Sequence, residues 1–187
     1  MMGWVKAVLA GVALYFTVTQ LSEASERHMY WKMAREYCDK VDKPLLRIGM
    51  RRSFTEPPNG DITLDIDPDV LNISGGVLGD ERDMPFGDKE FGVCFNEHTL
   101  EHLYNSRDVE LATNECIRVA DYAVLLAPGP NTIMGILHPD HKLRMWFTDK
   151  TIKVQRIPHV PGWKNLTFPG IGQAMVLSDE PPKIFEI

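Results

Sequence analysis

The sequence lacks the features that mark several common classes of protein. It has only three cysteines among its 187 residues, Cys38, Cys94 and Cys116, and their spacing fits no metal-binding motif. Because an odd number of scattered cysteines is not a disulfide framework, we expect reduced thiols in a reducing compartment. The chain has no internal repeat and no low-complexity stretch. Its 44% hydrophobic and 25% charged residues exclude collagen-like and disordered chains.

An excess of positive charge is also missing. Lys and Arg number 20 against 26 for Asp and Glu, which gives a net charge of -6. Proteins that bind nucleic acids neutralise phosphates with clustered cations. We therefore expect no nucleic-acid partner, and the length suits one ordinary domain better than two.

The first 21 residues form a distinct apolar segment. Lys6 is the only charged residue between Gly3 and Leu21, and residues 7–18 read AVLAGVALYFTV. Residues 3–21 suit a membrane anchor of about 20 residues, and the basic residues that follow favour a cytoplasmic domain. Two alternatives are a secretory signal that is cleaved near Ala24, so that the domain is exported, and a buried core helix.

An amphipathic helix is predicted to continue out of the apolar segment over residues 22–42. Met29, Met33 and Tyr37 are spaced four residues apart, which predicts an amphipathic helix with these side chains on its apolar face.

Residues 43–187 are predicted to form one domain of alternating strands and helices. Gly, Pro, Asp or Asn residues bound the four clearest apolar runs. The expected strands are 44–48, 62–66, 91–96 and 123–127, with weaker ones at 151–157 and 173–177. A helix predicted for 106–120 is too long for a hairpin, so its flanking strands should be parallel. The fold class is therefore α/β, with a doubly wound, mostly parallel sheet.

Polar residues gather where these strands end. Gly49 follows the first strand and Asp65 closes the second, sixteen positions later. An acidic side chain about 20 residues after such a glycine can bind the hydroxyls of a ribose. Because ligands of open parallel sheets bind outside the carboxyl ends of the strands, this edge is the expected ligand site.

Five segments of residues 43–147 resemble, in order and spacing, the class I methyltransferases that use S-adenosylmethionine, in particular the small-molecule branch. These segments are 62–70, 79–86, 91–103, 115–119 and 125–128. The resemblance implies a Rossmann-like methyltransferase sheet with S-adenosylmethionine as cofactor. The cofactor-binding residues that it implies are Gly49, Asp65 at the ribose, Asp80 and Glu81 at the adenine, and Asn96 at the methionine part.

The resemblance also implies a reaction and its residues. The acceptor would be small or lipid-like and would be methylated at a membrane. His98 or Glu97, after the strand at 91–96, would take a proton where the acceptor needs it. His138 and His141, after the strand at 123–127, would face the substrate.

The loop after the first strand departs from the pattern of that family. Arg47 stands where the family has an acidic residue, and Arg51 and Ser53 occupy its later glycine positions. Glycines there allow close approach of the backbone to the ligand. The alternative hypothesis is therefore a catalytically inactive methyltransferase fold that serves as a binding or scaffold protein.

A remote alternative comes from residues 98–102, which read HTLEH. The pattern H-x-x-E-H is typical of inverted zincins, in which two histidines on one helix bind zinc. A zinc hydrolase would use His98 and His102, with a third ligand from His138, His141 or Glu115. Because the resembling methyltransferases often carry HVLEH without a metal, we expect no metal ion.

Overall fold

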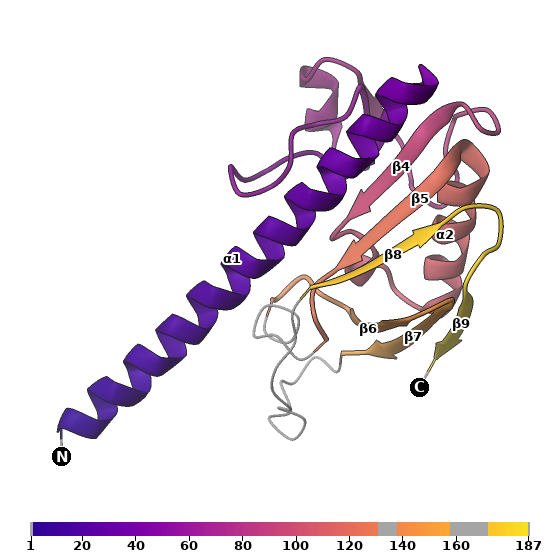
Figure 1. Ribbon diagram of the computed structural model, residues 1–187. Helices are drawn as coiled ribbons and strands as arrows, with labels where there is room; N and C mark the ends of the chain where they lie inside the picture. Colours follow the sequence, from indigo (N-terminus) through magenta and orange to yellow (C-terminus); the bar gives the residue numbers. More distant parts are fainter. Residues whose placement is uncertain (1, 131–137, 158–171, 187) are drawn as a thin grey trace.

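The structure, a computed structural model, describes residues 2–130, 138–157 and 172–186. Within these ranges, two helices, two short 3-10 helices and nine strands form a mixed α/β fold with one larger and one smaller sheet (Figure 1). In chain order they are α1 (Met2–Val41), β1 (Leu45–Ile48), β2 (Ile62–Asp65), η1 (Pro68–Asn72), β3 (Gly76–Leu78), β4 (Phe91–Glu97), η2 (Leu100–His102), α2 (Ser106–Val119), β5 (Ala120–Ala127), β6 (Leu143–Thr148), β7 (Thr151–Arg156), β8 (Gln173–Leu177) and β9 (Lys183–Glu186).

The larger sheet has six strands in the order β3-β2-β1-β4-β5-β8. The first five are parallel to their neighbours, and β8 pairs antiparallel with β5. All seven residues of β4 are buried, as expected for a central strand that is covered on both faces. The predicted mostly parallel α/β sheet is confirmed at this level.

The two helices cover opposite faces of this sheet. Phe95 of β4 belongs to the apolar cluster that includes Ala34 and Cys38 of α1, whereas Cys94 packs with Cys116 of α2. Successive side chains of a strand point to opposite faces, which explains this division. The predicted crossover helix is confirmed, because α2 joins the parallel strands β4 and β5.

The face of α1 that contacts the sheet differs from the predicted one. Met29 and Met33 are 51% and 55% exposed, so the predicted apolar stripe is wrong for both. The buried positions are Glu23, Ala34 and Cys38. A Cβ atom on Gly92 of β4 would lie 2.9 Å from the Cys38 sulfur, so the close approach of the helix to the strand requires this glycine.

Helix α1 is continuous across both N-terminal segments that the sequence suggested, and its N-terminal half extends beyond the sheets (Figure 1). Leu14, Val18 and Leu21 are exposed on it. In the part of the chain that the structure describes, no helix combines the length and apolar character that crossing a membrane requires.

The smaller sheet has the order β6-β7-β9, with β6 antiparallel and β9 parallel to β7. Met145 and Ile152 from this sheet belong to the same core cluster as Leu125 of the larger sheet. The smaller sheet therefore closes the α2 side of the core beyond the carboxyl end of β5.

Candidate functional site

A cavity of about 870 Å³ opens at the carboxyl edge of the larger sheet. Gly49, Asp65, Glu97 and Pro128, which end or follow β1, β2, β4 and β5, lie on its wall. The strand order reverses between β1 and β4, and ligands of open α/β sheets bind at such a switch point. The position of the cavity is thus the one that the parallel sheet predicts.

Most of the site residues predicted from the sequence meet in this cavity. The predicted residues that line it are Gly49, Asp65, Asp80, Glu81, Glu97, His98, His138 and His141. Asn96 is fully buried and is not among the lining residues. Sequence reasoning missed the contribution of α1, which adds Glu23 and Arg27 to the wall.

Asp65 connects the end of β2 to the loop after β1. Its two carboxylate oxygens accept hydrogen bonds from the backbone N–H groups of Met50, at 2.7 Å, and Asp67, at 2.8 Å. Gly49 precedes Met50 with a φ of 84°, a conformation that glycine adopts without steric cost. Because each carboxylate oxygen can accept a second hydrogen bond, Asp65 retains capacity for a ligand hydroxyl.

Asp80 and Glu81 are neighbours with different partners. The Arg82 guanidinium donates to Asp80 at 2.6 Å, and these hydrogen bonds lower the pKa of Asp80. Glu81 accepts hydrogen bonds from Asn96 Nδ2 at 2.7 Å and from the Thr99 hydroxyl at 2.8 Å. Burial nevertheless raises the pKa of Glu81 to about 7. Asn96 therefore positions Glu81.

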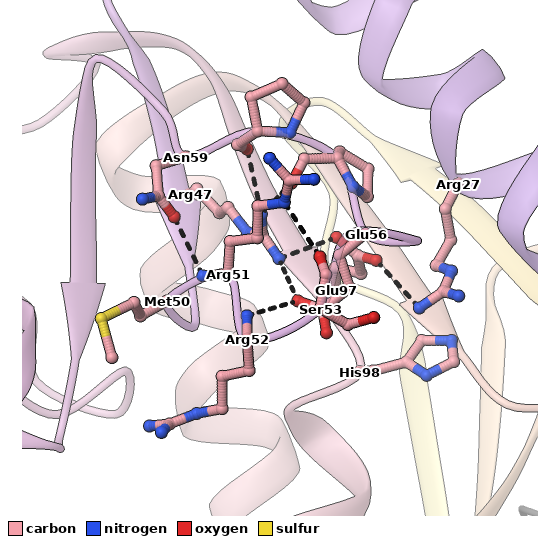
Figure 2. A network of polar contacts seen from close by, with 12 residues as sticks. Arg27, Arg47, Met50, Arg51, Arg52, Ser53, Glu56, Asn59, Glu97 and His98 are labelled. Atoms are coloured by element: carbon pink, nitrogen blue, oxygen red, sulfur yellow. Dashed lines mark hydrogen bonds and ion pairs between the residues drawn. The ribbon is translucent and has the colours of Figure 1, made fainter.

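Arg47 organises the loop between β1 and β2, as Figure 2 shows. Its side chain is 2% exposed, and its guanidinium donates to the backbone oxygens of Pro57, at 2.5 Å, and Pro58, at 2.9 Å. It also donates to Glu56 Oε2 at 3.1 Å. Burial lowers the pKa of Arg47 against the opposing effect of the nearby carboxylates. The loop thus folds around a buried cation.

Arg51 does not fill the cavity. It is exposed, and its guanidinium donates to the backbone oxygens of Ser53 and Phe54 in its own loop. Its backbone N–H donates to Asn59 Oδ1 at 2.9 Å. The substituted loop therefore leaves the space beside Gly49 open.

Glu97 lies between two arginines. Its carboxylate oxygens are 3.3 Å from an Arg27 nitrogen and 3.2 Å from an Arg47 nitrogen (Figure 2). Burial raises the pKa of Glu97, while the two cations act in the opposite direction. The two ion pairs fix this carboxylate between α1 and β1.

The HTLEH segment does not form the α-helix that its spacing suggested. His98 follows β4 with a φ of 53°, and only the short 3-10 helix η2 comes after it. The helical zinc site of His98 and His102 therefore lacks its scaffold. Glu115, another suggested ligand, accepts from the Met84 N–H and from Arg118 instead.

His98 and Glu101 are both held in their neutral forms. Burial, reinforced by Arg27, lowers the pKa of His98 to about 3. Burial also raises the pKa of Glu101 to about 8. The 3.8 Å contact between His98 Nδ1 and Glu101 Oε1 is therefore not an ion pair at neutral pH.

The structure instead brings together two residues of this motif, Glu101 and His102, and His141, which follows β5. One donor atom from each of Glu101, His102 and His141 lies within 4.8 Å of the others. His138 stacks on His141 with ring centroids 4.4 Å apart. The motif contained Glu101 and His102, but the sequence offered no means of choosing His141 over His98.

Comparison of the chain with protein-family models and with curated proteins finds no match in either.

Proposed function

We propose that the cavity binds S-adenosylmethionine and that the protein is a methyltransferase for a small or lipid-like acceptor. One observation carries the proposal: Asp65 and Asp80, expected at the ribose and the adenine, border the same cavity. The position of the cavity at the switch point of the strand order, where open α/β sheets bind ligands, supports it. Residues 3–21 are proposed to attach the protein to a membrane.

Catalysis in this proposal depends on positioning. Holding the methyl donor and the acceptor in line supplies a large part of the rate enhancement in such displacements. His98, with a pKa of about 3, is a weak base at pH 7. We assign it a hydrogen bond that orients the acceptor.

A catalytically inactive binding protein is the second candidate. The observation that favours it is the pairing of polar groups in the cavity wall, because Glu97 already faces Arg27 and Arg47. Such a protein would have lost the cofactor and would serve as a membrane-attached interaction module.

Calorimetry with S-adenosylhomocysteine on the full chain tests the nucleoside site. We expect micromolar affinity, and at least about tenfold weaker binding for Asp65→Asn, the loss of one good charged hydrogen bond. Asp69→Asn is the matched control, since Asp69 is exposed on η1 and outside the cavity wall. Absence of binding at millimolar ligand, or equal affinity in both variants, contradicts the proposal. Absence of binding supports the inactive alternative, which has lost the cofactor.

A further inference from the structure

We propose that Glu101, His102 and His141 form a zinc site whose open coordination position faces the cavity. Their donor atoms lie within 4.8 Å of one another, and all three residues line the cavity. The inference is independent of the proposed methyl donor, because it concerns a different part of the same wall.

The Glu101 carboxylate is the first reason. Its side chain is 2% exposed, and neither of its oxygens accepts a hydrogen bond within the described part of the chain. The imidazole nitrogens nearest to it, His98 Nδ1 and His141 Nε2, are 3.8 and 3.7 Å from Oε1. A buried carboxylate without hydrogen bonds is costly, whereas a bound cation would compensate it.

The tautomer of His102 is the second reason. Its Nδ1 lies 3.1 Å from the backbone oxygen of Asp140, which can only accept a hydrogen bond. Nδ1 therefore carries the proton, and the lone pair is on Nε2. Histidines that bind metals almost always donate their other N–H to a carbonyl or carboxylate in this way.

Distances and donor types indicate the metal. Donors around a tetrahedral zinc ion, each about 2.0–2.1 Å from it, are about 3.3 Å apart. Glu101 Oε1 and His141 Nε2, at 3.7 Å, are already close to that separation. Two imidazoles and one carboxylate suit zinc better than magnesium or calcium, which prefer oxygen ligands.

The open position defines what the ion would bind. Zinc sites with two histidines and one glutamate leave a fourth position for water or substrate. Here that position would be offered to an oxygen donor in the 870 Å³ cavity. A zinc ion acidifies a bound water or polarises a bound oxygen, and either effect would occur next to His98.

Zinc titration of the chelator-treated full chain, without any nucleoside, tests the site by calorimetry. We expect one ion per chain and about 100-fold weaker binding or more in His141→Gln. His28→Gln is the matched control, because His28 is exposed on α1 and is not part of the cavity wall. Equal zinc affinity in wild type and His141→Gln overturns the proposal.

A second measurement does not depend on the folding of any variant. Cobalt added to the metal-free wild type should give the intense visible absorption of a four- or five-coordinate ion. The weak spectrum of octahedral cobalt, or no spectrum, overturns the proposal. Binding of S-adenosylhomocysteine is measured separately, on the metal-free protein. Failure of the zinc proposal can therefore be distinguished from failure of the nucleoside proposal.

Discussion

Two glutamates four residues apart, Glu97 and Glu101, are equally buried but have opposite surroundings. Their side chains are 1% and 2% exposed. Glu97 faces two arginines, at 3.3 and 3.2 Å, whereas the side-chain nitrogens that face Glu101 belong to imidazoles, at 3.8 and 3.7 Å. Two cations of the chain neutralise Glu97, whereas Glu101 needs a proton or a bound cation. We therefore assign Glu97 a structural role and Glu101 a role in the proposed metal site.

The largest expected effect comes from removing Arg47, one of the two arginines that pair with Glu97. Arg47→Met leaves Glu97 and Glu56 without their shared guanidinium and should destabilise the protein by about 3–5 kcal/mol. Urea unfolding measures this. Arg107→Met is the control, since Arg107 is 67% exposed and its pair with Glu110 should contribute less than about 1 kcal/mol. Equal effects of the two substitutions would mean that the buried pair is not what stabilises the loop.

A smaller effect of opposite sign is expected at Glu101. In metal-free protein at pH 7, folding must protonate Glu101, whose pKa burial raises to about 8, whereas Gln is neutral in both states. Glu101→Gln should therefore raise the free energy of unfolding by about 1 kcal/mol, after the cost of burying its amide. The same denaturant titration, with chelator present, checks this. With zinc present the substitution should destabilise instead, because the metal stabilises only the intact site. A loss of stability without metal would remove the distinction between the two glutamates.

Glu81 is intermediate between Glu97 and Glu101, because it accepts hydrogen bonds from the neutral side chains of Asn96 and Thr99. Its pKa of about 7 in the folded protein lies above its ordinary value of 4.5, so the folded state binds the proton more tightly. Stability from this group is therefore present below pH 4.5 and is lost as the pH rises toward 7. Relative to Glu81→Gln, the wild type should lose about 1 kcal/mol between pH 5 and pH 6, measured by unfolding at each pH. A constant difference would show that burial does not perturb Glu81.

The fold could be predicted from the sequence where patterns are local. The apolar runs at 44–48, 62–66, 91–96 and 123–127 and the helical spacing in 106–120 predicted the central parallel strands and their crossover. The three-residue β3 is too short for a periodic signal, and β6 and β9 were not predicted.

The wrongly predicted face of α1 has a different cause. The apolar spacing predicted that the methionines face the sheet, but the residues that pack against β4 are the small Ala34 and Cys38.

The sequence by itself determined the α/β pattern and the polar strand ends, because alternation, helical spacing and chain order are local properties. It also put Gly49 and Asp65 at one edge, since the carboxyl ends of parallel strands meet there, whereas only the resemblance placed Asp80 beside them. Only the tertiary structure decided which charges pair. Arg27 and Glu97 are seventy residues apart in the chain, and Glu101 and His141 forty. Their contacts depend on how α1 and the segment after β5 pack around the sheet, and no spacing in the sequence encodes that packing.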